Sequence, residues 1–271
     1  MKIQGSCGVV TGAASGIGEA VSMALAGRGV KGLALVDRSD RVEEVAETIR
    51  KQYPNTHLIP FNGDVCDADF RAEVFDEAAK QIGQVRLCVP AAGVTRDRLA
   101  VKVNKETGKG DVYPIEDFRL VTEVNLIAPI YWALEMIKGI AESRFNRGLK
   151  RWGPAEEPEG ATIFIGSVSS QGNQGQISYS ATKSGLAGAD ATLAKEAMFY
   201  GVSCGVIHPG FTDTPMVRAM GEKYIAEHIL PATQLGRLIK PEEIADAICF
   251  MMSNVAVTGE LWADAGWHPA A

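Results

Sequence analysis

The stretch Thr11-Gly-Ala-Ala-Ser-Gly-Ile-Gly18 decides the fold of this chain, because it joins a β-rich apolar run to a helical segment. Ser6–Thr11 predicts a buried strand, and Gly16–Arg28 predicts a helix. Glycines in such a turn let a phosphate approach the backbone, and the helix N-terminus adds free N–H donors. The spacing T-G-x-x-x-G-x-G differs from the commoner G-x-G-x-x-G, so its place between strand and helix carries the prediction of a dinucleotide site. The predicted cofactor contacts here are Gly12, Ser15, Gly16, Ile17 and Gly18.

Outward from this turn, the strand-then-helix order repeats along the chain. The predicted strands are Ser6–Thr11, Gly32–Asp37, His57–Phe61, Leu87–Ala91, Ala161–Gly166, Val202–His208 and Glu260–Ala263. The predicted helices lie near Gly16–Arg28, Arg41–Gln52, Asp67–Gln81, Ile115–Glu142, Ser178–Tyr200 and Pro241–Ser253. Regular βα alternation implies a mostly parallel sheet covered on both faces, with right-handed crossovers. We therefore expect a single α/β domain over residues 1–271, a doubly wound Rossmann fold with a seven-stranded sheet.

Two stretches interrupt this alternation. Arg96–Tyr113 holds a glycine-rich turn between short β-leaning pieces, which predicts a small hairpin or an ordered loop. Asn146–Gly160 is rich in Gly, Pro and charge, which predicts a surface loop.

Composition limits the possible partners and compartments. The chain has 271 residues and a formal net charge of −6, which argues against a nucleic-acid-binding face. The basic cluster Arg144, Arg147, Lys150 and Arg151 is interpreted as a solvated loop. Five cysteines have no metal-binding spacing, and His57, His228 and His268 have no metal partners at usable spacing, so no metal is predicted. Free thiols and the lack of a signal segment or membrane-spanning apolar run predict no membrane partner and a cytoplasmic location, or an organelle matrix.

Carboxylates after the second and third predicted strands indicate the cofactor. Asp37 can accept hydrogen bonds from an adenosine ribose diol and would repel a 2′-phosphate, which favours NAD over NADP. Arg38 leaves NADP open, because its guanidinium can bind a 2′-phosphate, whereas Ser15 offers no charge for one. Asp64-Val65 can lie beside adenine. The alternatives are that Asp37 is a helix N-cap or a turn residue, a role that can coexist with ribose binding, and that Asp64 opens a turn, with Asp67 as a second cap.

A serine, a tyrosine and a lysine form the predicted catalytic group. Ser167 directly follows the run Ala161–Gly166, at the strand end where open α/β sheets place ligands. Tyr179 and Lys183 stand at i and i+4 of the predicted helix, so they share one face. Ser169 or Ser170 could replace Ser167 in this role. The alternative for the tyrosine and lysine is a surface pair.

Together these residues resemble the short-chain dehydrogenase/reductase family. The motifs fall in the family's order over nearly the whole chain: Thr11-Gly-x-x-x-Gly-x-Gly18, Asp37, Asp64, Ala92-Gly93, Asn125, Ser167, Tyr179-x-x-x-Lys183, Pro209-Gly210 and Thr258-Gly259…Asp264. The resemblance implies hydride transfer between a nicotinamide and a secondary alcohol or ketone, with Tyr179 exchanging the proton. The ordinary pKa of tyrosine is about 10. A positive charge about 4 Å away contributes about 4 kcal/mol at an effective dielectric of about 20, so Lys183 and oxidised nicotinamide are expected to lower this pKa, while desolvation opposes the shift.

The resemblance also assigns the remaining roles. It implies that Ser167 binds the substrate oxygen, that Lys183 also holds the nicotinamide ribose, and that Asn125 holds a water of a proton relay. From the sequence alone, Asn125 is a polar helix residue that bonds locally. Further implied cofactor contacts are Ala92, Gly93, Pro209, Gly210, Thr212 and Thr214. His208 is interpreted as a strand-end packing residue.

Two departures from the family pattern affect the sheet and the C-terminal turn. Pro90-Ala91 stands where the family commonly has Asn-Asn, and the proline removes a backbone N–H, which puts the stabilisation of the central sheet in doubt. Ala265 replaces a common glycine.

The substrate depends on the segment after the nicotinamide turn. By resemblance, residues 215–234 form a mobile helical lid, with Met216, Val217, Met220, Tyr224 and Ile225 along the cleft, and Gln174 and Gln176 add polar contacts. The insertion Arg96–Tyr113 resembles the 3-hydroxyacyl-CoA and hydroxysteroid dehydrogenase branch, which implies a fairly large apolar, cyclic or acyl-thioester substrate. The resemblance also implies a homotetramer or homodimer paired through apolar faces of the Ile115–Glu142 and Ser178–Tyr200 helices, with burial of these faces in the protein's own core as the alternative. Two alternatives stay open: an NADPH-dependent 3-oxoacyl thioester reductase, and a catalytically silent NAD-binding regulator.

Overall fold

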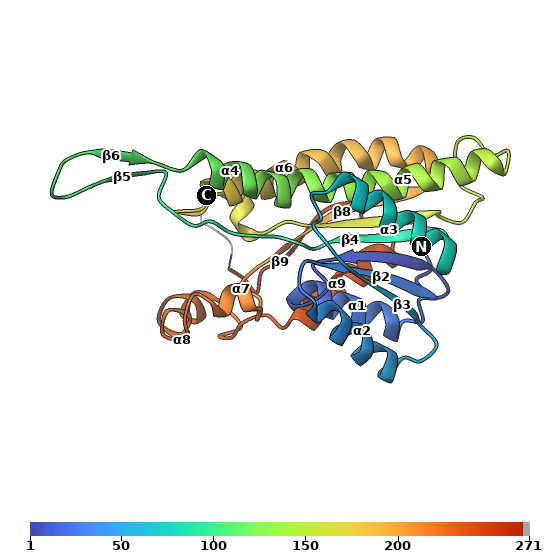
Figure 1. Ribbon diagram of the computed structural model, residues 1–271, viewed down its shortest axis with the longest axis horizontal. Coiled ribbons are helices and arrows are strands. Elements are labelled where there is room, and N and C mark those ends of the chain that lie inside the picture. The colour runs from blue at the N-terminus through green and yellow to red at the C-terminus, as the bar shows by residue number, and fades with distance from the viewer. Residues whose placement is uncertain (268–271) are drawn as a thin grey trace.

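Seven parallel strands form the central sheet, in the order β3-β2-β1-β4-β7-β8-β9. The computed structural model describes residues 1–267 (Figure 1). The strands are β1 Cys7–Thr11, β2 Gly32–Asp37, β3 His57–Asn62, β4 Val85–Pro90, β7 Gly160–Ile165, β8 Val202–Pro209 and β9 Gly259–Ala263. Every pairing between them is parallel. The predicted doubly wound α/β fold is confirmed, and the sheet is wholly rather than mostly parallel.

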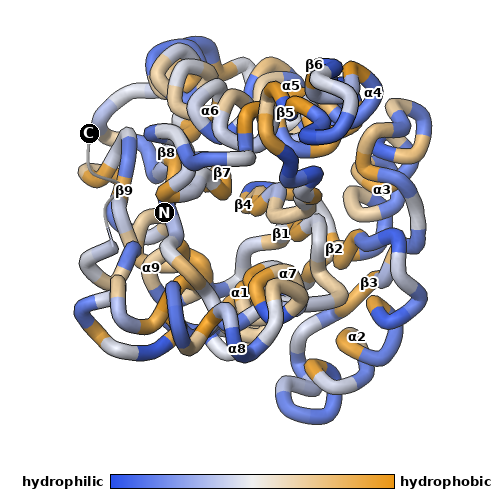
Figure 2. The backbone as a smooth tube through the Cα atoms, turned by 90° about the vertical axis from the view of Figure 1, so that its left-hand side faces the viewer, coloured by the Kyte–Doolittle hydropathy of each residue, from blue (hydrophilic) through white to orange (hydrophobic). Residues whose placement is uncertain are grey.

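Helices cover both faces of the sheet. One face carries α1 (Gly16–Gly27), α2 (Arg41–Gln52) and α9 (Pro241–Ser253), and the other carries α3 (Ala68–Gln81), α5 (Ala128–Asn146) and α6 (Ile177–Glu196). Figure 2 shows the two helical layers on opposite sides of the strands. Each layer turns apolar side chains to the sheet, which explains why the strands are continuous hydrophobic runs.

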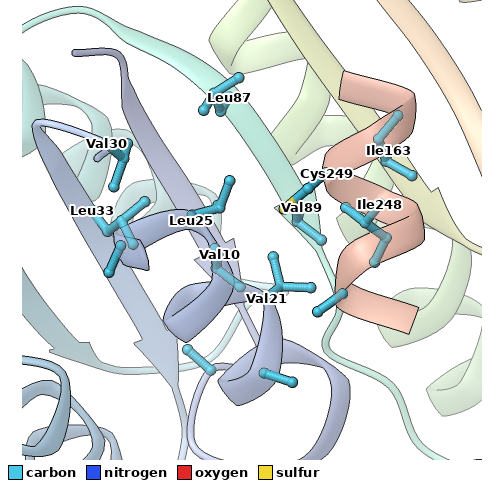
Figure 3. Close-up of a cluster of buried hydrophobic side chains, with 14 of the residues drawn as sticks. Val10, Val21, Leu25, Val30, Leu33, Leu87, Val89, Ile163, Ile248 and Cys249 are labelled. Atoms are coloured by element: carbon cyan, nitrogen blue, oxygen red, sulfur yellow. The ribbon is translucent and has the colours of Figure 1, made fainter. Parts of the chain in front are cut away.

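The core between α1, α9 and the sheet holds the cofactor end in place. Val10, Val21, Leu25 and Ile248 are fully buried in it (Figure 3). Burying a side chain of this size stabilises the fold by about 1.5–3 kcal/mol. Because α1 is fixed on this core, its N-terminus stays aimed at the carboxyl end of β1.

The order of strands reverses between β1 and β4. The chain runs outward from β1 to β3 and then returns to β4 on the other side of β1. Ligands bind at such a switch point, beyond the carboxyl ends of the strands. Here the Ala91 N–H donates to the Thr11 carbonyl at 3.2 Å, and the Ala92 N–H donates to the Thr11 hydroxyl at 3.2 Å. Thr11 therefore ties the two strand ends together next to Pro90, where the sequence left the stabilisation in doubt.

The predicted helix Ile115–Glu142 is confirmed, and it contains a π-helical turn that the sequence did not predict. The structure has α4 (Ile115–Thr122), a π-helix at Glu123–Ile127, and then α5. Single-turn π segments inside α-helices often occur at functional sites, and Asn125 lies in this one. By length and composition alone, Ile115–Asn146 could cross a membrane, but half of its most apolar window is buried inside the protein, which is also typical of a core helix.

The two predicted interruptions are found, with one correction. Strands β5 (Val101–Val103) and β6 (Gly110–Val112) form an antiparallel hairpin that projects from the molecule (Figure 1). The segment before β7 has no helix or strand, as predicted. Arg144, interpreted from the sequence as solvated, is instead only 1% exposed, because Glu156 and Glu159 of this loop pair with its guanidinium.

The segment after β8 is helical. It contains α7 (Pro215–Arg218), α8 (Glu222–Tyr224), a π-helix at Ile225–Ile229 and a 3-10 turn at Leu230–Ala232. A second 3-10 turn, Ala197–Tyr200, extends α6 to the predicted end of that helix. The helical character of the lid is confirmed, and its mobility stays a prediction.

Candidate active site

The glycines of the N-terminal turn serve the protein's own packing as well as a ligand. A Cβ on Gly12 would lie 2.7 Å from the Ala92 nitrogen, and one on Gly18 would lie 2.2 Å from the Gly12 carbonyl oxygen. Gly16 has a φ of 57°, in the left-handed region that favours glycine. The turn is therefore fixed by close backbone contacts, and it leaves an open cradle at the N-terminus of α1 that fits a diphosphate.

A cavity of about 290 Å³ runs from this cradle to the catalytic tyrosine. Its walls include every residue predicted for the turn, the adenosine end and the β4 loop: Gly12, Ser15, Gly16, Ile17, Gly18, Asp37, Arg38, Asp64, Val65, Ala92 and Gly93. Tyr179, Lys183 and Thr214 close its other end. The residues present thus fit a nicotinamide dinucleotide.

Asp37 and Asp64 each line the cavity and also accept hydrogen bonds in a turn, whereas the helix-cap alternative for Asp37 is wrong because Asp40 is the N-cap of α2. The Ala14 N–H donates to one Asp37 oxygen at 3.0 Å, and the Ser39 N–H donates to the other at 2.9 Å. The Cys66 N–H donates to Asp64 at 2.9 Å, so Asp64 opens a turn and lines the cavity. A carboxylate has about four acceptor positions, so Asp37 can still accept from a ribose diol.

The residues of the turn after β8 are divided between the cavity, the adjoining pocket and the protein interior. Thr214 lines the cavity, and its hydroxyl caps α7 by accepting from the Val217 N–H at 3.4 Å. Gly210 lines the adjoining pocket instead. Pro209 and Thr212 are buried and are outside the lining of both cavities among residues 1–267, because Thr212 turns back to the Gly210 carbonyl at 3.1 Å. The resemblance assigns the backbone of Thr212 to the nicotinamide carboxamide, and this contact, like that of Pro209, stays a prediction.

Ser167, Tyr179 and Lys183 meet at the carboxyl end of β7. The hydroxyls of Ser167 and Tyr179 are hydrogen-bonded, which selects Ser167 over Ser169 and Ser170. The Lys183 ammonium lies 5.4 Å from the centre of the Tyr179 ring, and it donates to the Ile165 carbonyl at 2.7 Å. The i, i+4 spacing on α6 therefore brings the phenol and the ammonium into one site, as predicted.

The protein's own electrostatics oppose ionisation of the phenol. Desolvation raises the pKa of Tyr179 to about 12, while the Ser167 hydrogen bond lowers it and the charge of Asp97 raises it further. Desolvation lowers the pKa of Lys183 to about 8. The expected lowering of the tyrosine pKa is therefore not achieved by the protein alone, because burial outweighs the Ser167 hydrogen bond. A cationic nicotinamide is the remaining source of positive charge in the proposed reaction.

Asn125 joins the π-helix to the loop after β4. Its amide nitrogen donates to the Val94 carbonyl at 2.8 Å, and its oxygen accepts from the Val94 N–H at 2.9 Å. Both ends of the side chain are thus used by the backbone. Asn125 fixes the loop that carries Ala92 and Gly93, and its role in a water relay stays a prediction.

A second pocket of about 470 Å³ adjoins the catalytic group and forms the substrate side. Its lid wall contains the predicted Met216, Val217, Met220 and Tyr224, and Gln174 and Gln176 lie opposite. The prediction that Ile225 lines this pocket is wrong. Ile225 is 2% exposed and packs with Ile229 and Leu238 inside the lid.

Several pocket residues were missed by the sequence analysis. Thr95 and Asp97 follow Ala92-Gly93 at the carboxyl end of β4, and this position could have indicated them. Phe211 and Trp267 lie edge to face at 5.2 Å, although they are far apart in sequence. Nothing in the local pattern predicts that contact.

Comparison with known proteins gives the family. A family model described as enoyl-(acyl carrier protein) reductase matches residues 12–268. The chain belongs to the short-chain dehydrogenase/reductase family. This confirms the resemblance drawn from the motifs. Members of the family are oxidoreductases that use a nicotinamide cofactor, and a small-molecule substrate fits the pocket of this member.

Similar members of the short-chain dehydrogenase/reductase family span the whole chain. The 3-oxoacyl-[acyl-carrier-protein] reductase FabG of Escherichia coli is 29% identical over 263 residues, which are 96% of each chain. FabG of Thermotoga maritima is 30% identical over 266 residues, with the same coverage. FabG of Pseudomonas aeruginosa is 30% identical over 262 residues, which are 96% of this chain and 95% of the relative.

Within residues 1–267, no three His, Cys, Asp or Glu side chains gather as a metal site. His57 and His228 belong to this part of the chain, whereas His268 lies outside the described residues. All five cysteines are free thiols, and four of them are buried.

Proposed function

We propose that this oxidoreductase interconverts a ketone and a secondary alcohol with NAD(H). The observation that carries the proposal is the Tyr179 hydroxyl, bonded to Ser167 beside Lys183, where the dinucleotide cavity opens into the substrate pocket. The nicotinamide supplies or accepts the hydride. Ser167 holds the substrate oxygen against the phenol, and Tyr179 donates a proton to that oxygen during reduction and removes it during oxidation.

The choice of NAD(H) is supported by Asp37. Its carboxylate is held by the Ala14 and Ser39 N–H groups, so it cannot easily turn away from a 2′-phosphate. Arg38 lines the same cavity and supports NADPH as the second candidate. A charge at Asp37 in contact with a phosphate is repulsive, which favours NAD(H).

The leading substrate class is a 3-oxoacyl thioester. Relatives of full length are named 3-oxoacyl-[acyl-carrier-protein] reductases, and they favour the ketoreductase alternative over a general alcohol dehydrogenase. The lid wall offers Met216, Val217 and Met220 to an acyl chain, while Asp97 and Gln176 offer polar groups across the pocket. A fairly large cyclic alcohol or hydroxysteroid is the second substrate class.

Assembly into a homotetramer or homodimer in the cytoplasm is part of the proposal. Several large apolar side chains on the α4–α5 segment are exposed: Ile115, Leu120, Ile127, Tyr131 and Leu134. Pairing of two such faces would remove this surface from water. Light scattering of the purified protein tests the assembly.

The first test measures reduction of a short 3-oxoacyl thioester with NADH and with NADPH. Tyr179→Phe is expected to lower turnover by about 10³-fold while NADH still binds, because only the exchangeable proton is lost. Tyr200→Phe is the matched control, since Tyr200 lies outside both cavities. Full activity of Tyr179→Phe would overturn the assigned chemistry. Failure of the wild type on thioesters and on a broad alcohol panel would favour the silent NAD-binding regulator.

The second test concerns the coenzyme. Asp37→Asn keeps an acceptor oxygen for the Ala14 N–H and removes the charge. We expect the wild type to prefer NADH, and we expect this substitution to improve the kcat/KM with NADPH by about tenfold. A wild-type preference for NADPH would contradict the role given to Asp37.

A further inference from the structure

A buried imidazole stands behind the catalytic serine and is not used by the reaction proposed above. His208, near the end of β8, is fully buried and stacks on Trp262 with ring centres 4.1 Å apart. A Cβ on Gly166 would lie 2.5 Å from His208 Nδ1, so the glycine before Ser167 makes room for the ring. Gly166, which precedes Ser167, therefore has to lack a side chain so that the His208 ring can pack against it.

A carboxylate sets which ring nitrogen carries the proton. Glu260 Oε2, on the neighbouring strand β9, lies 2.7 Å from His208 Nε2. A carboxylate only accepts hydrogen bonds, so Nε2 carries the hydrogen. Burial lowers the pKa of His208, which keeps the ring neutral near pH 7 and leaves Nδ1 as an acceptor.

The free nitrogen faces the Ser167 turn. The Ser167 N–H points to Nδ1 at 3.3 Å, and the Ser170 hydroxyl lies 2.9 Å from the same atom. The Ser167 carbonyl oxygen is also near, at 3.1 Å. In the neutral ring Nδ1 therefore accepts from the serine turn and fixes the backbone of Ser167, whose hydroxyl bonds Tyr179.

We propose that His208 and Glu260 are positioning residues that hold Ser167 in the geometry needed for proton transfer. The inference rests on the proposed function, because it assigns Ser167 a substrate-binding role. Protonation of the ring would put a hydrogen on Nδ1, facing the Ser167 N–H, so that Nδ1 could no longer accept and would donate instead to the Ser170 hydroxyl oxygen or the Ser167 carbonyl. The turn then changes its partner, and activity falls on the acid side.

Charged groups on each packed element affect this titration. Glu260 of β9 favours the charged ring, and Lys183 of α6 disfavours it. Asp190 of α6 interacts with Glu260, and burial first, then Glu260, raises the pKa of Asp190 to about 7. Asp190→Asn is therefore the control that separates this carboxyl from His208. Carbonyl reduction is the direction to measure, since Tyr179 stays protonated through the acid range.

The experiment compares His208→Asn with His208→Leu in the full-length enzyme. An Asn oxygen can replace Nδ1 as acceptor but cannot titrate, whereas Leu removes the acceptor. We expect Leu to lower kcat by about tenfold or more, with unchanged KM for NADH and a larger primary isotope effect from 4-deuterated NADH. We expect Asn to keep kcat within about threefold and to lose the acid limb. Glu260→Gln should move the acid limb to lower pH.

Equal losses in both His208 variants, with the wild-type acid limb retained in Asn and in Glu260→Gln, would overturn the proposal. Glu260 is partly exposed, so Glu260→Gln gives a folded variant if either His208 variant fails to fold. Nitrogen-15 NMR adds a readout without turnover: the wild type should show a protonated Nε2 and a bare Nδ1. An active Tyr179→Phe enzyme refutes the proposed function, whereas an inactive one beside a wild-type-like His208→Leu refutes only this inference.

Discussion

Two buried cations at opposite ends of the fold show how differently this protein treats charge. Arg144, at the C-terminal end of α5, is 1% exposed, and its guanidinium bonds Glu156 at 2.7 Å and Glu159 at 3.0 Å. It also donates twice to the Lys150 carbonyl. Lys183, in the active site, is 5% exposed, and a single carbonyl accepts from its ammonium at 2.7 Å.

The pKa values of the two cations move in opposite directions. The Glu156 hydrogen bond is the largest cause that raises the pKa of Arg144, whereas desolvation lowers the pKa of Lys183 to about 8. The paired cation holds the loop 146–160 against the helix. The unpaired cation costs stability, and its charge remains available to a phenol and a ribose. Burial of the lysine charge in the active site therefore lowers the stability of the fold, whereas burial of the arginine charge beside the loop is offset by its carboxylate partners.

Removing the unpaired cation gives the largest expected effect. Lys183→Met should lower turnover by about 10³-fold, because the phenol loses the cation that neighbours it on α6. The same change should raise stability at pH 7. Moving the pKa of this ammonium from 10.5 to about 8 corresponds to about 3 kcal/mol of destabilisation, an upper limit because the Ile165 carbonyl loses its donor. Urea unfolding and steady-state rates measure both, and a less stable variant would break the comparison.

Removing the paired cation should do the opposite. Arg144→Met removes the guanidinium that joins Glu156 to Glu159, although Glu159 keeps Arg86 and Arg147, and this should lower the free energy of unfolding by up to about 3 kcal/mol. Turnover should stay within about twofold, because Arg144 lies outside both cavities of the active site. The measurement is urea unfolding beside an activity assay. A variant as stable as the wild type would show that the pair contributes nothing net.

The difference between Lys183→Met and the wild type should depend on pH. The folded-state pKa of Lys183, about 8, is below the ordinary 10.5, so the unfolded chain binds more protons between these values. The wild type therefore gains stability from this group as the pH rises from about 8 to about 10.5. The advantage of the variant should shrink by up to about 3 kcal/mol over that window. Thermal melts of both proteins across this range check the sign, and a constant difference would contradict it.

The smallest effect should come from an exposed partner of the same loop. Arg147 bonds Glu159 at 2.7 Å, but its side chain is 47% exposed. Arg147→Met should therefore change the free energy of unfolding by less than about 1 kcal/mol. Compared with Arg144→Met in the same urea series, it separates burial from mere contact with a carboxylate. Equal losses in the two variants would mean that burial of the cation is not what matters.

The cofactor end could be predicted from sequence because its determinants are local. The glycine turn, Asp37 and Asp64 each follow a strand, and the parallel order of strands brings all such ends to one edge. Tyr179 and Lys183 were found for the same reason, since helical spacing alone places them on one face. The β5–β6 hairpin could also be predicted, because a glycine-rich turn lies between two short segments of β-forming residues.

The features that failed to be predicted depend on contacts between distant segments. Whether Arg144 is solvated depends on a loop that folds back 12 and 15 residues later. The helix departs from α geometry around Asn125, whose side-chain amide is hydrogen-bonded to both the N–H and the carbonyl of Val94. The direction of the Tyr179 pKa depends on how much water the surrounding elements exclude, which no spacing encodes.

The sequence by itself determined the fold class, the family and which residues were candidates for proton exchange, because strand and helix periods and short motifs are properties of neighbouring residues. Only the tertiary structure decided which of those residues carry an energetic cost and which are compensated. Burial and pairing are set by segments far apart in the chain, such as β8 and β9 around His208 or the loop around Arg144. The physical environment of Arg144 and of Lys183 therefore decides whether burial of the cation costs stability.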